Sequence, residues 1–384
     1  MRKLTLLAPL AVTVFALAAC SSASTDTGGS TSAPSSATTT SGASACGTTV
    51  DQIAAAAKKE GKLNLIALPD TWANYGGILK SYRDTYGIDA KVANPDASSA
   101  DEITAIQTLR GQADMPELVD VGASFTKQMI DEGYADVYKP TTWDQIPDAL
   151  KDPAGHWVAS YYGVMSIATN TTLVPDAPKT FKDLEDPKYK GQVTLNGDPR
   201  EAGAAFAAVM AASLANGGSF DNITPGIEYF GKLKASGNLQ AVDVTQATLL
   251  SGEVPIALDW TYNFPAIKPL MKDAGFDMQV TVPSDGVYGG YYAQSVVTQA
   301  EHPCSSRLFL EHLVGDDGAL GYLEGGAIPA RYATLVKEGK VDTELAKNLP
   351  DAATIAKIAF PTQAQIDAAK TTLAAQWGPM VADK

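Results

Sequence analysis

Residues 63–87, LNLIALPDTWANYGGILKSYRDTYG, carry the clearest structural signal in the chain. The apolar run at 63–68 has the length of a buried strand, and a short polar loop follows it. From residue 74 onward apolar side chains recur at helical spacing, and Gly87 provides a helix end. The stretch therefore predicts a strand, a loop and an amphipathic helix, which together form the repeating unit of an α/β sheet.

The same alternation continues on both sides of this unit. In the first half we expect strands at 89–93 and 118–121. We expect helices at 51–60 and 125–132, and a further helix opened by a capping box at Ser99–Glu102. In the second half we expect strands near 192–195, 254–258 and 278–282, a helix starting with Asp198 as its N-cap, and helices near 225–235, 305–314, 317–323 and 363–377. Such alternation predicts the α/β class, with mostly parallel sheets flanked by helices.

Two further strand-like segments, 162–169 and 287–297, bracket the middle of the chain. We interpret them as crossings between two lobes. The first lobe would then contain residues 47–165 and 290–384, and the second lobe residues 166–289.

The N-terminus has the features of an export signal. Residues 1–20 place two basic residues before an apolar stretch that ends in Leu-Ala-Ala-Cys, with Cys20 as its last residue. Residues 21–46 follow as a tether rich in Ser and Thr, which cannot bury a core. An ordinary signal peptide with a chance cysteine is the alternative. We expect the folded body to work outside the cytoplasmic membrane, where Cys46 and Cys304 form a disulfide or remain two unpaired thiols.

Composition and missing motifs exclude several classes of protein. The formal net charge of −14 argues against binding to nucleic acids or to anionic lipids by charge. Three histidines and three cysteines without clustered spacing argue against a zinc site, and we expect neither a metal nor a cofactor. The chain has no Walker A, G-x-G-x-x-G, G-x-S-x-G or H-E-x-x-H motif, so we do not expect an enzyme. The remote alternative is an enzyme that uses a pair of the 43 acidic residues.

The loops after the expected strands are rich in aromatic, carboxylate, amide and hydroxyl side chains. In open α/β sheets ligands bind beyond the carboxyl ends of the strands, so these loops are the expected binding site for a small polar solute. The candidate binding residues are Asp70, Trp72, Tyr75, Ser99, Ser124, Arg200, Asp259, Trp260, Tyr262, Asn263, Tyr291 and Arg331. We expect the solute to lie between Trp72 and Tyr75 on one lobe and Trp260 and Tyr262 on the other.

Several stretches resemble a known family in the right order, among them TWANYGGILKSYRDTYGI (71–88), PELVDVGASFTKQMIDEGYADVY (116–138) and LLSGEVPIALDW (249–260). Together with the Leu-Ala-Ala-Cys motif and the tether, the chain resembles the solute-binding lipoproteins of bacterial ABC importers, in the branch that binds ferric ion, polyamines, thiamine or phosphonates. The resemblance implies a periplasmic-binding-protein-like fold of type 2. It also implies a lipid on Cys20, a monomer held at the outer face of the cell membrane, and delivery of the solute to a membrane permease.

The resemblance leaves the solute open. A polyamine-like cation is favoured, because aromatic faces and carboxylates such as Asp70 or Asp259 attract ammonium groups. A phosphonate or small carboxylate is the alternative, with Arg200, Arg331 and helix N-termini as partners. Ferric ion is a third candidate, but Asn263 stands where the branch's ferric binders have the second tyrosine of a pair. A surface lipoprotein without a transport role is a separate possibility.

Overall fold

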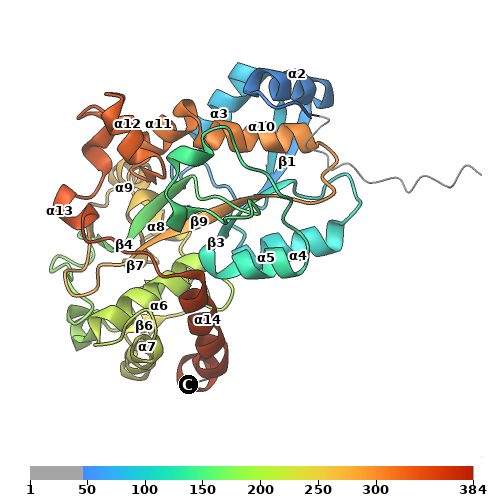
Figure 1. The fold of residues 1–384 in the computed structure, drawn as a ribbon. Helices are drawn as coiled ribbons and strands as arrows, with labels where there is room; N and C mark the ends of the chain where they lie inside the picture. Colours follow the sequence, from blue (N-terminus) through green and yellow to red (C-terminus); the bar gives the residue numbers. More distant parts are fainter. Residues whose placement is uncertain (1–45, 384) are drawn as a thin grey trace, which may run out of the picture. The chain divides into compact units, whose positions relative to one another are not determined.

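The computed structural model describes residues 46–383 (Figure 1). The expected signal peptide, Cys20 and all of the tether except Cys46 lie outside the described residues. Within 46–383, no helix combines the length and the apolar character that a membrane span requires.

The first sheet has the strand order β2-β1-β3-β9. Strands β1 (Lys62–Ile66), β2 (Asp89–Ala93) and β3 (Leu118–Gly122) are parallel, and β9 (Gly289–Val296) runs antiparallel to β3. Helices cover both faces: α2 (Val50–Glu60), α3 (Tyr75–Tyr86) and α10 (Pro303–Val314) lie above the sheet in Figure 1, and α4 (Ser99–Leu109) and α5 (Thr126–Asp131) lie below it. This is the α/β arrangement that the alternation predicts.

The second sheet is built around β4 (Tyr161–Asn170). Strands β7 (Ile256–Trp260) and β8 (Met278–Thr281) pair antiparallel with β4, and β7 continues in parallel to β5 (Val193–Leu195) and β6 (Leu239–Gln240). Its helices are α6 (Gly203–Ala215), α7 (Thr224–Ser236), α8 (Gln246–Leu250) and α9 (Ile267–Asp273). Strands β4 and β9 pair with each other, with Tyr162 opposite Tyr291, so they connect the two sheets as the expected crossings.

The C-terminal part of the chain follows β9. It contains α11 (Asp316–Glu324), β10 (Ile328–Pro329), α12 (Tyr332–Lys337), α13 (Ala352–Ile355) and α14 (Gln363–Trp377). Helix α14 touches elements of both lobes. Lys370 Nζ donates a hydrogen bond to the Ser124 carbonyl beside β3, and the ring of Trp377 lies 5.9 Å from that of Phe230 on α7.

Two expected helix starts are wrong in position. Ser98, and not Ser99, is the N-cap of α4, and Asp101 completes its capping box. Asp198 does not cap α6, which begins five residues later at Gly203. The Asp198 carboxylate instead accepts hydrogen bonds from the Arg200 guanidinium, while its carbonyl accepts from Glu201 N in a turn. The Asp-Pro sequence therefore makes a turn before the helix and not its first residues.

A disulfide joins Cys46 to Cys304 at the start of α10, with their Cα atoms 5.3 Å apart. The first described residue is thereby attached to the first lobe. The cysteines are separated by 258 residues in sequence, so the bond closes a loop that contains most of the described chain.

Candidate binding cleft

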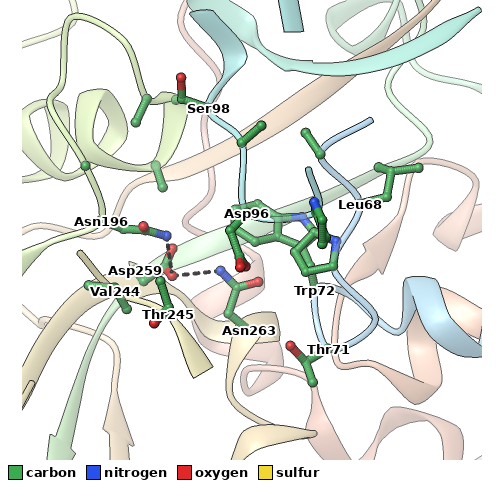
Figure 2. A pocket seen from close by; sticks show the side chains of 18 of the residues that line it. Leu68, Thr71, Trp72, Asp96, Ser98, Asn196, Val244, Thr245, Asp259 and Asn263 are labelled. Atoms are coloured by element: carbon green, nitrogen blue, oxygen red, sulfur yellow. Dashed lines mark hydrogen bonds between the residues drawn. The ribbon is translucent and has the colours of Figure 1, made fainter. Parts of the chain in front are cut away.

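A cavity of about 790 Å³ lies between the two sheets. From the first lobe it is lined by the segments after β1 (67–72) and β2 (95–99), and from the second by 196–198 after β5 and by the residues that end and follow β7. These are the carboxyl ends of the strands, where ligands of open α/β sheets bind. Figure 2 shows Trp72 and Asp96 from the first lobe facing Asn196, Asp259 and Asn263 from the second.

Asp259 in strand β7 is the central acidic residue of the second lobe. Its side chain is buried, and Oδ2 accepts hydrogen bonds from Asn196 Nδ2 at 2.9 Å and from Asn263 Nδ2 at 2.8 Å (Figure 2). The Trp260 amide donates to Oδ1 at 2.8 Å. Burial raises the pKa of Asp259 to about 6, although these hydrogen bonds act in the opposite direction. None of the salt bridges among the described residues involves Asp259.

Asn263 also lines the cavity and has an unused acceptor. It is 8% exposed, and its Oδ1 is buried without a hydrogen-bond partner among the described residues. A buried amide oxygen without a partner costs free energy, so a hydrogen bond from one N–H or O–H donor to this atom would be stabilising. Asp259 and Asn263 together therefore form a site that favours a donor group.

The first lobe contributes a pair of buried acids, Asp120 and Glu102. Asp120 on β3 accepts hydrogen bonds from the hydroxyls of Tyr75 and Tyr161, both at 2.9 Å, and from the amide of Gln294. Burial raises the pKa of Asp120 to about 6. Glu102 accepts from the Asp120 amide at 2.9 Å, and burial, followed by the nearby Asp120 charge, raises its pKa well above the ordinary value.

Negative charge predominates around the cavity. The acidic lining residues are Asp70, Asp96, Asp101, Glu102, Asp120, Asp198, Glu201, Asp243 and Asp259. Arg83 is the basic residue that lines the cavity within 46–383, and its guanidinium already donates to the Ala90 carbonyl. Asp198 is neutralised by Arg200 and Asp101 caps α4, but the remaining carboxylates still outnumber the one cation.

Trp72 provides an aromatic wall. It is half-buried, lines the cavity and donates a hydrogen bond from Nε1 to the Tyr161 hydroxyl at 2.7 Å. Its ring packs edge-on against Tyr292 and Tyr262, with centroid distances of 5.2 and 5.6 Å. Tyr292 also lines the cavity, whereas Tyr262 lies behind it.

The structure brings five of the expected binding residues to the cavity: Asp70, Trp72, Ser99, Asp259 and Asn263. Tyr75, Trp260 and Tyr262 are buried and do not line it. Trp260 and Tyr262 stack on each other with centroids 6.0 Å apart, and Tyr262 contacts Trp72 directly, so the four aromatic residues do not form two separate walls.

The other four expected residues lie elsewhere. Ser124 and Tyr291 line a separate small cavity of about 10 Å³. Arg200 pairs with Asp198. Arg331 is buried and donates to the Val314 carbonyl and to Asp316.

Several cavity residues are not among the twelve candidates named from the sequence, although Asp96 lies in an expected binding loop; they include Asp96, Glu102, Asp120, Asn196 and Tyr292. For Tyr291 and Tyr292 the sequence indicates that one of the two faces the cavity, because neighbours on a strand point to opposite sides. Only the register of β9 against β3, with Tyr292 opposite Gly122, decides which tyrosine faces the cavity.

The described residues contain no group of three or more His, Cys, Asp or Glu side chains placed to hold a metal ion. Tyr262, which precedes Asn263 and would be the first tyrosine of a ferric-binding pair, is buried away from the cavity. The cavity therefore offers acceptor atoms and an aromatic face, which suit hydrogen-bond donors and organic cations.

Solved structures of binding proteins share this fold. A periplasmic binding protein from Actinobacillus pleuropneumoniae with bound fructose-6-phosphate is 18% identical and covers 84% of this chain and 99% of its own, with a TM-score of 0.66. A spermidine/putrescine ABC transporter protein from Listeria monocytogenes, described as putative, is 14% identical and covers 83% of this chain and 99% of its own, with a TM-score of 0.59. These similarities confirm the predicted two-lobed periplasmic-binding-protein fold.

A curated relative adds a match in sequence. An uncharacterised protein of Haemophilus influenzae is 25% identical over 216 residues, which are 52% of this chain and 59% of the relative. The chain thus spans less than two thirds of that relative's length.

The family comparison matches residues 113–360, which include β3, both crossing strands and the whole second lobe. The matched family consists of proteins that bind solutes, not of enzymes. The chain belongs to the family of bacterial extracellular solute-binding proteins.

Proposed function

We propose that the chain captures a small organic cation with amine groups, such as a polyamine, and delivers it to the permease of an ABC importer. Family membership supports the capture of a solute, and the neighbour from Listeria monocytogenes is named for spermidine and putrescine. The choice of a cation rests on the residues of this chain's own cavity.

The observation that carries the proposal is the buried Asp259 carboxylate without a cationic side chain. Amide donors reduce the cost of burying its charge but do not neutralise it, and its pKa of about 6 reflects the remaining cost. A protonated amine supplies both the missing charge and a donor for Asn263 Oδ1. Ligand binding would then relieve a penalty that the empty site carries.

The first lobe supports the same solute. Asp120 and Glu102 form a second buried acidic group, and the half-buried Trp72 offers an aromatic face to a cation. One acidic group on each lobe suits a molecule with two positive charges. Such a molecule would attract both lobes and favour the closed arrangement.

An anionic solute is the second candidate, for one specific reason. Helix α6 begins with no side-chain cap, and its first residues, Gly203 and Ala204, line the cavity. Free amides at a helix N-terminus bind anions, and the Actinobacillus pleuropneumoniae neighbour holds a sugar phosphate. Against this candidate, Arg200 is already paired with Asp198, and Arg331 is paired with Asp316 outside the cavity. The surrounding carboxylates also repel a phosphate.

We further propose that Cys20 carries a lipid, that residues 21–46 act as a tether, and that the protein works as a monomer at the outer face of the membrane. The Leu-Ala-Ala-Cys sequence supports the lipid anchor. The disulfide between Cys46 and Cys304 is consistent with an oxidising compartment.

A thermal-shift panel tests the nature of the solute. The chain is heated with putrescine, spermidine, thiamine, fructose-6-phosphate, methylphosphonate and ferric citrate in separate samples. A ligand present at 100 times its dissociation constant stabilises a protein by about 2.7 kcal/mol, which is readily visible. We expect a clear shift with an amine and none with the anions. A shift with fructose-6-phosphate or methylphosphonate alone would contradict the cation proposal.

A further inference from the structure

Two glycines from opposite lobes touch at the edge of the cleft. Gly122 ends β3 in the first lobe, and Gly203 begins α6 in the second. A Cβ atom on Gly122 would lie 2.8 Å from Gly203 Cα, and a Cβ on Gly203 would lie 2.9 Å from Gly122 Cα. Both distances are shorter than any normal carbon contact, so neither position accepts a side chain in this arrangement.

The backbone conformation does not explain these glycines. Gly122 has φ −54°, which any residue adopts, and Gly203 is not among the glycines with positive φ. Glycine is otherwise found where another backbone approaches closely. The feature that requires glycine here is therefore the contact between the lobes.

Neighbouring contacts place this pair in a defined junction. Ala100 N, in the first lobe, donates a hydrogen bond to the Glu201 carbonyl in the second at 3.2 Å. The Gly122 amide donates to Ser99 Oγ at 3.0 Å. Gly203 lines both the cleft and the small second cavity, while Gly122 lines only the second, so the pair stands between the two spaces.

We propose that the Gly122–Gly203 contact is the stop that defines the fully closed state of the lobes. Closure brings the acidic groups of the two lobes to one solute, and the two bare Cα atoms allow the last part of that movement. Atoms of the main chain on both sides cannot move aside as a flexible side chain does. A methyl group at either position therefore holds the lobes apart and lowers the closed population.

The inference predicts an effect on affinity without any contact between Gly122 and the solute. When only the closed state binds tightly, the apparent dissociation constant rises as the closed fraction falls. Gly122→Ala and Gly203→Ala should each weaken solute binding by about tenfold. This measurement of affinity uses putrescine as the probe and therefore rests on the proposed function.

The primary test does not need a solute. Nitroxide labels are attached at two exposed positions, one on each lobe, through Asp84→Cys and Lys232→Cys in the full chain with Cys20→Ala, so that no third free thiol is labelled. Pulsed electron paramagnetic resonance then gives the distribution of distances between the lobes, with and without putrescine. We expect the shortest distances of the parent chain to be absent from both Gly122→Ala and Gly203→Ala.

Gly111→Ala is the matched control. Gly111 has φ +74° and open space around its Cα, so the added methyl group strains the local backbone but meets no other atom. This variant should lose some thermal stability and keep the parent distance distribution. Short distances that persist in both junction variants would overturn the closure stop. Failure of putrescine to bind, with the short distances lost as expected, would instead contradict only the proposed solute.

Discussion

Asn263 donates a hydrogen bond from Nδ2 to Asp259 Oδ2 over 2.8 Å, while its own Oδ1 is buried without a partner among the described residues. The amide thus supports the carboxylate and adds one acceptor beside it. A neutral polar solute would satisfy Oδ1 but leave the buried charge of Asp259 unpaired. A protonated amine satisfies both, which is why the geometry favours a cation.

The buried carboxyls predict an unusual dependence of stability on pH. Asp120 and Asp259 each have a pKa of about 6 in the folded chain and an ordinary value of 3.8. Between about pH 4 and 6 the folded chain binds more protons than the unfolded chain, so the free energy of unfolding should fall as pH rises. The expected loss is about 1–3 kcal/mol for each group. His312, whose pKa is lowered by burial, opposes this trend.

Urea unfolding of the solute-free chain at intervals from pH 4 to 7 measures this dependence. Asp259→Asn should remove the part of the decrease in the free energy of unfolding that Asp259 causes, and the part caused by Asp120 should remain. A free energy of unfolding that rises steadily across this range in the parent chain would contradict the assignment of buried, unpaired carboxylates.

Trp72 and Trp260 should respond differently to truncation. Trp260 is 2% exposed and stacks against Tyr262, so Trp260→Ala should lower the free energy of unfolding by about 3–5 kcal/mol. Trp72 lines the cavity, so Trp72→Ala should weaken amine binding about fivefold, a loss of about 1 kcal/mol of cation–π attraction. Chemical unfolding and titration calorimetry of both variants separate the two roles. Unchanged amine affinity in Trp72→Ala would remove this residue from the proposed site.

The disulfide should protect both cysteines from alkylation and stabilise the folded chain against unfolding. Mass spectrometry after alkylation without reductant should find Cys46 and Cys304 unmodified and linked. Cys304→Ala should lower the free energy of unfolding by about 2–5 kcal/mol, since a cross-link between distant residues restricts the unfolded chain. Full alkylation of both thiols in the non-reduced protein would show that the bond does not form in solution.

Lipid attachment makes a separate prediction at Cys20. Metabolic labelling with a fatty acid should mark the parent protein in its bacterial host. Cys20→Ala should lose the label and accumulate as an unprocessed precursor. Equal labelling of the two proteins would contradict the lipid anchor.

The sequence predicts the secondary structure well where local rules dominate. The strand at 89–93 and the helix at 363–377 appear with the expected bounds, because apolar spacing and capping residues are local signals. The start of α6 was not predicted, because Arg200 competes for the Asp198 carboxylate that would otherwise cap the helix. The contact between Arg200 and Asp198 depends on the conformation of the folded loop, so the local sequence does not reveal it.

The cleft could be predicted as a region but not residue by residue. The loops after β1 and β7 do line it, as the rule for strand ends predicts. Trp260 and Tyr262 follow the same rule in sequence and are nevertheless buried, because packing between the two crossing strands and Trp72 covers them. Asp120 lies in the middle of β3 and Glu102 in the first turn of α4, so neither belongs to a loop that the strand-end rule marks.

Titration calorimetry of putrescine into the parent chain, Asp259→Asn and Asp243→Asn at pH 7.5 tests the central claim most directly. Asp243 is an exposed acid at the same cavity and controls for a general loss of negative charge. The buried Asp259 carboxylate should contribute at least about 2 kcal/mol, so Asp259→Asn should bind about thirtyfold more weakly than the parent. Asp243→Asn should stay within about twofold of the parent, because exposed charge pairs contribute little. Equal affinities of Asp259→Asn and the parent, or no binding of putrescine to the parent chain, would contradict a cation held by Asp259.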